Sequence, residues 1–218
     1  MHTNYNGSVC ILFYLIMLLH LSTFQFENVA NKKPTFKYTS MRQQMSFFLV
    51  DLRRMLGKQK SRILYIWLSR VFWGIFSYRL DRGLFLLLGK SYKYIRIILI
   101  PFFNLWNAYS NIDINYKAVI GKGLIVLHPS MGIVISGKSL IGDGLTLTGG
   151  NVIGAKAGCD YGDLIIGNNC SLGANAVIIG PIKLANNITI GALACVLNDC
   201  ETNDVLLVGI PAKPRENK

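Results

Sequence analysis

Aliphatic side chains recur at every sixth position between Leu164 and Asp199. The residues at these positions are Ile166, Leu172, Ile178, Leu184, Ile190 and Val196. Four residues after each of them stands a small or branched side chain: Cys170, Ala176, Ile182, Ile188, Ala194 and Cys200. An α-helix repeats its faces every 3.6 residues, so it cannot keep a period of six on its buried side. The pattern therefore predicts short strands stacked as a solenoid, with one tight bend per hexapeptide.

The expected bends coincide with asparagines. Asn168-Asn169, Asn175 and Asn186-Asn187 occupy bend positions, and asparagine, like glycine, tolerates a positive φ. Three hexapeptides would close one triangular coil, with successive coils at the spacing of paired strands, about 4.8 Å. A β-sandwich of short strands is the alternative, but its strands do not keep a fixed six-residue step.

The six-residue step also extends upstream, with two interruptions. It fits five earlier aliphatic residues: Ile120, Val126, Ile141, Leu147 and Ile153. The interruptions cover residues 129–137 and 154–163. Insertions in a solenoid form loops, and loops on a rigid scaffold often carry function. We therefore expect functional residues near these two segments.

The formal net charge of +12 originates in the first half of the chain. Residues 1–110 hold 15 basic and 3 acidic side chains, whereas residues 111–218 hold 8 of each. With the hexapeptide pattern, this predicts three segments: an apolar extension over residues 1–40, a basic amphipathic helical region over 41–110, and a β-helix domain over 111–218.

The helical region interleaves basic and aromatic residues. Such a stretch is typical of an interfacial helix on an anionic membrane. The other interpretation is a helical cap whose apolar face packs on the β-helix or on a neighbouring subunit. Nucleic acid is the usual competitor for a basic patch, but the apolar content is too high for a solvated phosphate-binding face. We predict no nucleic-acid partner and a possible peripheral contact with a membrane.

Residues 1–40 contain an uncharged apolar run, Val9–Leu19. The run is short for a membrane span and has the length of the apolar core of a signal peptide, but no basic residue precedes it. It is interpreted as an extension without a catalytic role, a membrane anchor or a cleaved signal. A start at Met41 or Met45 would leave it out.

The cysteines favour a reducing compartment. There are five of them, an odd number without a CxxC pair, and Cys170 and Cys200 fall at inward repeat positions. Disulfides are not needed to explain them. We therefore expect a cytoplasmic protein, with any membrane contact at the cytoplasmic face.

His128 is the only histidine in the repeat region, and it opens the first interruption. Asp113 precedes it by 15 residues, close to one coil of 18, so the two side chains are expected on adjacent coils. A carboxylate can orient an imidazole and leave its other nitrogen free as a general base. The alternatives are a structural histidine and a turn-capping aspartate. A zinc site of the β-helical carbonic anhydrase type needs three imidazoles, so no metal is predicted.

The segment from Asn111 to Lys213 resembles the left-handed parallel β-helix acyltransferases of the hexapeptide-repeat superfamily. It is most similar to the serine O-acetyltransferase branch and to O-acetyltransferases of surface-polysaccharide clusters. The matching motifs are Ile112-Asp113-Ile114, His128 with Gly132–Ile135, Thr146–Gly150, Gly173–Ala176 and Gly209–Lys213. The left hand of the helix is implied by this resemblance, because parallel crossovers are otherwise right-handed.

The resemblance implies acetyl-CoA as co-substrate and a homotrimer or dimer of trimers, with active sites between neighbouring β-helices. His128 would deprotonate the acceptor hydroxyl, and Asp113 would orient His128. The residues implied in cofactor binding are Gly149, Gly150, Gly173, Ala174, Ala192, Gly209 and Lys213. Backbone amides near Gly149 and Gly150 would stabilise the oxyanion, and Lys213 would lie near phosphate.

Two departures from the serine enzymes bear on the acceptor. Those enzymes carry an acidic residue before the catalytic histidine and an Arg-His pair in the long loop. Here these places hold Leu127 and the loop Gly158–Asp163. A zwitterion would lose its charge-assisted contacts, whereas a neutral sugar hydroxyl needs none. We expect an acceptor on a surface polysaccharide or glycolipid precursor, with serine, for cysteine biosynthesis, as the alternative. The non-enzymatic alternative is a β-helix scaffold.

Overall fold

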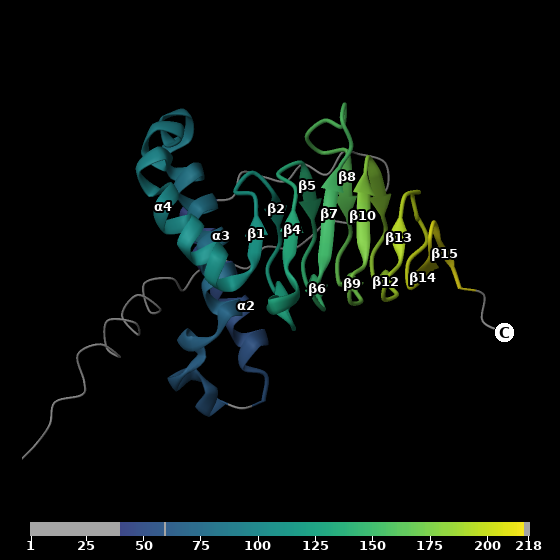
Figure 1. Cartoon of the computed structure of the whole chain (residues 1–218), viewed down its shortest axis with the longest axis horizontal. Coiled ribbons are helices and arrows are strands. Elements are labelled where there is room, and N and C mark those ends of the chain that lie inside the picture. Colours follow the sequence, from purple (N-terminus) through teal and green to yellow (C-terminus); the bar gives the residue numbers. More distant parts are fainter. Residues whose placement is uncertain (1–39, 59, 216–218) are drawn as a thin grey trace, which may run out of the picture. The chain divides into compact units, whose positions relative to one another are not determined.

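Three sheets form the walls of a coil, as the hexapeptide step predicts (Figure 1). The computed structural model describes residues 40–58 and 60–215, so the predictions for residues 1–39 fall outside it. The described residues belong to one compact unit, Tyr38–Lys218.

The strands enter the three walls in rotation. Sheet A contains β1 (Ile112–Ile114), β4 (Ile133–Ile135), β7 (Asn151–Ala155), β10 (Val177–Gly180) and β13 (Cys195–Val196). Sheet B contains β2 (Val119–Ile120), β5 (Ser139–Ile141), β8 (Leu164–Ile166) and β11 (Ile182–Leu184). Sheet C contains β3 (Ile125–Val126), β6 (Thr146–Leu147), β9 (Ser171–Leu172), β12 (Thr189–Ile190), β14 (Leu206–Gly209) and β15 (Ala212–Pro214). Among the described strands, the pairs between coils are parallel, and only β14 and β15 pair antiparallel as a closing hairpin.

The hexapeptide positions fill the interior of the coil. The aliphatic residues at every sixth position are at most 3% exposed: Ile166, Leu172, Ile178, Leu184, Ile190 and Val196. The residues four places later are also buried, with Cys200 at 8% the most exposed of them. The prediction of the inward face is confirmed, because both sets of positions point into the prism.

At the bends, asparagine and glycine have different structural roles. Asn169, Asn175 and Asn187 adopt positive φ angles of 54°, 56° and 58°, as predicted. Gly167 and Gly173 have no positive φ. A Cβ on Gly167 would lie 2.4 Å from the Ala185 carbonyl oxygen of the next coil. The asparagines thus provide the left-handed conformation, and these glycines allow the coils to approach one another.

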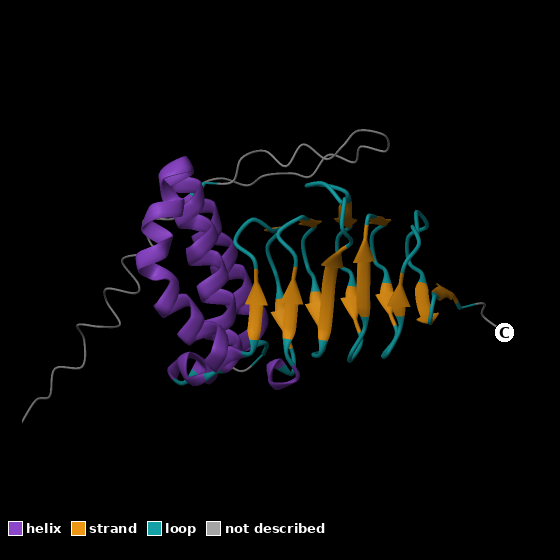
Figure 2. Cartoon of the chain, turned by 45° about the horizontal axis from the view of Figure 1, so that its top comes forward, coloured by secondary structure: helices purple, strands orange, loops and turns teal. Residues whose placement is uncertain are grey.

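The helical region begins with α2 (Met41–Leu56), capped by the Ser40 hydroxyl, which accepts from the Gln43 N–H. The 3₁₀ turns η1 (Lys60–Leu64) and η2 (Ile66–Leu68) lead into α3 (Arg70–Leu88). After η3 (Gly89–Ser91), α4 (Tyr92–Ser110) returns antiparallel to α3 and contains Pro101 (Figure 2). Within the described residues, no helix has both the length and the apolar character needed to cross a membrane.

The helices cover the open end of the first coil, where edge strands would otherwise leave backbone groups unpaired. The Arg79 guanidinium of α3 donates to the carbonyls of Ile120 and Gly121 at 2.8 and 2.5 Å and pairs with Asp51 of α2 at 2.9 Å. The Asp51 carboxylate accepts from the Gly123 and Leu124 amides at 2.6 and 2.8 Å. Burial raises the pKa of Asp51, and Arg79 together with the two amides counteracts that shift. A buried, hydrogen-bonded ion pair thus fixes the helices to the coil.

Candidate active site

His128 lies at the corner where the chain passes from sheet C to sheet A. The ladder of β3 extends past its last residue, because the Leu127 and His128 amides donate to Leu147 and Thr148 at 2.9 and 2.8 Å. The chain then forms the 3₁₀ turn η4 (Pro129–Met131) before β4 begins. The imidazole is exposed, so substrate can reach it.

The η4 turn is held by the coils on either side. The Asn111 side-chain amide donates to the Ser130 carbonyl at 3.0 Å, and the Gly132 carbonyl accepts from the Gly150 amide at 2.8 Å. Gly132 has a φ of 84°, which suits glycine and lets the chain turn into β4. The first predicted interruption is therefore five residues at a corner, 128–132, and β4 itself is a regular strand.

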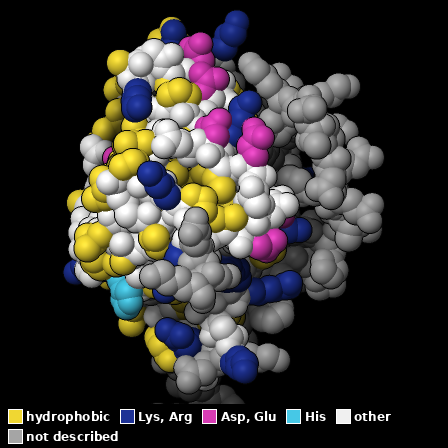
Figure 3. Space-filling view, turned by 90° about the vertical axis from the view of Figure 1, so that its right-hand side faces the viewer, with side chains coloured by type: hydrophobic (Ala, Val, Ile, Leu, Met, Phe, Trp, Pro, Cys, Tyr) yellow, Lys and Arg dark blue, Asp and Glu magenta, His cyan; other side chains and the backbone are white. Residues whose placement is uncertain are grey.

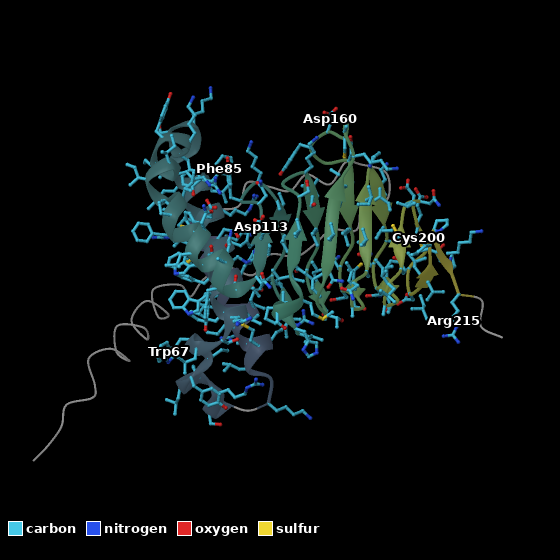
Figure 4. The ribbon with its side chains drawn as sticks, in the orientation of Figure 1. Trp67, Phe85, Asp113, Asp160, Cys200 and Arg215 are labelled. Carbon is cyan, nitrogen blue, oxygen red and sulfur yellow. The ribbon has the colours of Figure 1, made fainter. Side chains whose placement is uncertain are left out.

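Asp113 lies in the middle of β1 with its side chain outward, between the buried Ile112 and Ile114 (Figure 4). Its partner on β4 is Val134, so the carboxylate stands one strand away from the segment that His128 opens. Among the described residues, Asp113 and His128 form no hydrogen bond or ion pair with each other. The topology thus brings both groups to the first two coils without joining them.

The surface around these two residues is apolar. Leu127, Met131 and Val134 are 49%, 45% and 48% exposed. On the outer side of sheet A, the strand register aligns a row of residues from coil to coil: Asp113, Val134, Val152, Val177 and Cys195. Asp113 is the only charged residue of that row. An acceptor bound here would meet aliphatic side chains, one carboxylate and one imidazole.

Five of the predicted cofactor residues follow His128 along the same corner. We call His128 and these five residues the corner row. Gly149 and Gly150 lie between β6 and β7, Gly173 and Ala174 between β9 and β10, and Ala192 between β12 and β13. Backbone bonds link the successive levels: Asn175 N–H to Gly149 O at 2.8 Å and Leu193 N–H to Ala174 O at 2.9 Å. From His128 to Ala192 the row spans three coil steps of about 4.8 Å each. Small residues at three consecutive levels leave a shallow edge beside the imidazole.

The amides of Gly149 and Gly150 are engaged within the protein. Gly149 N–H donates to the Asn151 side-chain oxygen at 2.9 Å, and Gly150 N–H donates to Gly132 O at 2.8 Å. These two amides therefore have bonding partners other than an oxyanion, contrary to the role expected for them. A Cβ on Gly149 would lie 2.4 Å from the His128 carbonyl oxygen, so this glycine supports the turn beneath the histidine.

Asn151 is a supporting residue that sequence reasoning missed. It is 1% exposed, and its side-chain nitrogen donates to the carbonyls of Gly173 and Ala176 at 2.7 and 3.3 Å. It stands four residues after Leu147, at an inward position that is otherwise small or aliphatic. An asparagine at an inward position of the repeat could have indicated this role, because a buried side-chain amide needs hydrogen-bond partners.

Gly209 and Lys213, the other two predicted cofactor-binding residues, lie on the hairpin that closes the coil. Val208 of β14 pairs with Lys213 of β15, and Gly209 has a φ of 93°. Lys213 and Arg215 are both exposed. Figure 4 shows Arg215 at this end of the protein. Two cations therefore stand beyond the last level of the corner row.

The second interruption forms a loop at a different corner, between sheets A and B. It follows β7 and ends at β8, and Asp160 and Tyr161 at its tip are exposed (Figure 4). The Lys138 ammonium donates to the Cys159 carbonyl, which holds the loop against the preceding coil. Within one chain, this loop and His128 therefore occupy different corners of the prism.

In the described part of the chain, no three His, Cys, Asp or Glu side chains cluster to hold a metal ion.

Comparison with solved structures gives the class of the protein. The soybean serine acetyltransferase apoenzyme matches with a TM-score of 0.66 and 26% identity, covering 79% of this chain and 69% of that one. The Neisseria gonorrhoeae serine acetyltransferase matches with a TM-score of 0.63 and 26% identity, covering 80% of this chain and 66% of that one. A serine acetyltransferase solved with CoA shares the fold at 22% identity, a TM-score of 0.60, and coverage of 79% and 70%. No family model and no curated protein matches.

The coil is therefore a left-handed parallel β-helix of the hexapeptide-repeat class, which confirms the predicted fold. Within this class the chain is similar to the serine O-acetyltransferases, as the sequence motifs indicated. It spans about two thirds of the length of the enzymes it matches.

Proposed function

We propose that this protein is an acetyl-CoA-dependent O-acetyltransferase in which His128 is the general base. The observation that carries the proposal is the corner row, in which an exposed imidazole adjoins three levels of small residues. The structural likeness to serine acetyltransferases supports the reaction class.

The reaction needs one proton transfer in each direction. His128 takes the proton of the acceptor hydroxyl while the hydroxyl oxygen attacks the thioester carbonyl carbon. The tetrahedral intermediate collapses, the C–S bond breaks, and the sulfur of CoA receives the proton from the imidazolium. The products are the O-acetyl ester and free CoA. Asp113, one strand away, would orient the imidazole once substrate brings the two side chains together.

We place the pantetheine arm along the corner row, beside Gly173, Ala174 and Ala192. The Gly209–Lys213 hairpin would meet the nucleotide end, where Lys213 and Arg215 supply positive charge for phosphate. A serine acetyltransferase of the same fold binds CoA, which supports this assignment.

We propose that the working unit is a homotrimer. The loop with Asp160 and Tyr161 occupies the corner between sheets A and B, whereas His128 occupies the corner between sheets C and A. A neighbouring copy would bring one corner against the other and complete the site. Free Cys159, Cys170, Cys195 and Cys200 fit a reducing compartment, so we place the reaction in the cytoplasm.

The acceptor that fits the apolar surroundings of His128 is a neutral hydroxyl of a surface-polysaccharide or glycolipid precursor. Leu127, Met131 and Val134 offer no charge to a zwitterion. Serine is the second candidate, favoured by the likeness to serine acetyltransferases.

A thiol-release assay distinguishes the two acceptors. Purified protein is incubated with acetyl-CoA and either serine or glycan precursors, and free thiol is measured. Serine-dependent release that His128→Ala abolishes would replace the glycan by serine.

A β-helix used as a scaffold is the non-enzymatic alternative. Binding of acetyl-CoA separates it from the proposal. An enzyme is expected to show a higher melting temperature with acetyl-CoA and to release CoA in the presence of an acceptor. If acetyl-CoA changes neither, the enzymatic proposal fails.

A further inference from the structure

The outward face of α4 is apolar along most of its length. Six of its large side chains are strongly exposed, by 47% to 73%: Tyr94, Ile97, Ile98, Phe102, Leu105 and Tyr109. At 100° per residue these positions share one side of the helix. The opposite side is buried against the protein through Tyr92, Phe103 and Ser110. A surface helix normally turns polar side chains to water, so the outer face of α4 is built for something less polar than water.

This face continues onto the η1–η2 segment. The Tyr109 hydroxyl donates to the Leu68 carbonyl at 3.0 Å, and the Trp73 indole, stacked on Trp106, donates to the Trp67 carbonyl at 2.7 Å. The segment adds five more exposed apolar side chains: Ile63, Leu64, Tyr65, Trp67 and Leu68. Trp67 is labelled in Figure 4. Leu64 is 77% exposed. We call α4's outer face together with these residues the apolar face.

All exposed charges in the described part of the helical region are positive. Asp51 and Asp81 are the only acidic residues in the described part of the helical region, and both are buried and paired with arginines, Arg79 and Arg96. Arg54 of α2 instead bonds Gly123 and Thr146 of the coil. The exposed cations on or directly beside the elements that form the face are Arg62, Arg70, Lys90 and Lys93. Two of them touch aromatic rings of the face, Lys93 over Tyr94 at 4.7 Å and Arg70 over Tyr109 at 5.9 Å.

We propose that the apolar face docks peripherally on an anionic lipid bilayer. Exposed tyrosine and tryptophan rings, aliphatic side chains and a rim of lysines and arginines together match the interface of such a membrane. A purely apolar protein partner would explain the aliphatic residues but not the one-signed charge. The inference is independent of the acetyl transfer proposed above.

The opposite end of the coil differs in charge. Figure 3 looks onto that end, where acidic and basic side chains lie among hydrophobic ones. Asp199, Glu201 and Asp204 are exposed there, near the closing hairpin. Lys213 and Arg215 are exposed at the same end, so its charges largely offset one another. An anionic surface would therefore attract the helical end more strongly than the closing end, which orients the docked protein.

The test is sedimentation of the full chain with vesicles. We expect binding to vesicles that contain phosphatidylglycerol and weaker binding to vesicles of phosphatidylcholine alone. Ile98→Glu combined with Leu105→Glu should reduce binding at least tenfold, because two carboxylates would enter the interface. Lys93→Glu combined with Arg70→Glu should remove the preference for the anionic vesicles. Both pairs are exposed, so circular dichroism and the melting temperature should remain those of the unaltered protein.

Leu193→Glu is the matched control, because Leu193 on the coil is 66% exposed and Leu105 is 67% exposed. It should bind vesicles as the unaltered protein does. Vesicle binding that survives Ile98→Glu with Leu105→Glu would overturn the proposal. The proposal also fails if the unaltered protein does not bind anionic vesicles. A lower solution mass of the Ile98→Glu, Leu105→Glu variant would then show that a second copy covers the face.

Discussion

Gly149 lies directly under the backbone of His128, so close that a Cβ on the glycine would stand 2.4 Å from the histidine carbonyl oxygen. The same Cβ would come within 3.2 Å of the Met131 side chain. The glycine also has a φ of 145°, which other residues rarely adopt. The position of the imidazole thus depends on the absence of a side chain one coil away.

Gly149→Ala should lower both stability and activity. We expect a loss of about 1–3 kcal/mol from strain and overpacking. We also expect a fall in kcat of up to about 100-fold if the imidazole shifts by about 1 Å. Urea unfolding and thiol-release kinetics measure the two effects. Gly57→Ala is the control, because Gly57 has a φ of 57° at the end of α2 but meets nothing within 4 Å. Equal activity losses in both variants would contradict this role of Gly149.

His128→Ala should reduce kcat for CoA release by about 10²–10⁴-fold, the range for a lost general base. The KM for acetyl-CoA should stay unchanged, because the small-residue row and not the imidazole holds the cofactor. Asp113→Asn should reduce kcat less and also leave that KM unchanged, because Asp113 acts through His128. A raised KM with unchanged kcat in either variant would show that the residue binds substrate only.

Arg79→Met should destabilise the protein by about 3–5 kcal/mol, because Asp51 would remain buried without its partner. The carbonyls of Ile120 and Gly121 would also lose their donor. Lys122→Met tests a partly exposed pair, in which the Lys122 ammonium and the Asp143 carboxylate are 3.9 Å apart. It should change stability by no more than about 1 kcal/mol. Similar unfolding midpoints for the two variants would contradict the role given to Arg79.

Leu193→Asn should stabilise the protein by about 1 kcal/mol. Leu193 has a φ of 60° at a bend, a conformation that costs ordinary residues about 1–2 kcal/mol and asparagine less. Its side chain is 66% exposed, so little burial is lost. Denaturant unfolding gives the free-energy difference. Leu197→Asn, at an exposed position without a positive φ, should give no gain.

The sequence alone determined the coil, its inward residues and its asparagine bends. These features repeat within six residues, so composition and spacing reveal them before any long-range contact is known. The resemblance of its motifs to hexapeptide-repeat acyltransferases also placed His128, Gly149, Gly173 and Ala192 in one site in prediction, and the structure arranges them along one corner.

Only the tertiary structure decided how those groups are used. It showed that the amides of Gly149 and Gly150 already donate within the protein and that Asn151 bonds the row from inside. It also showed that Asp113 and His128, both described residues, form no hydrogen bond or ion pair with each other. It also paired Arg79 with Asp51 and left the outer face of α4 exposed among the described residues. Each depends on contacts between residues far apart in the sequence, and a local pattern does not specify which distant group satisfies a hydrogen bond or covers a surface.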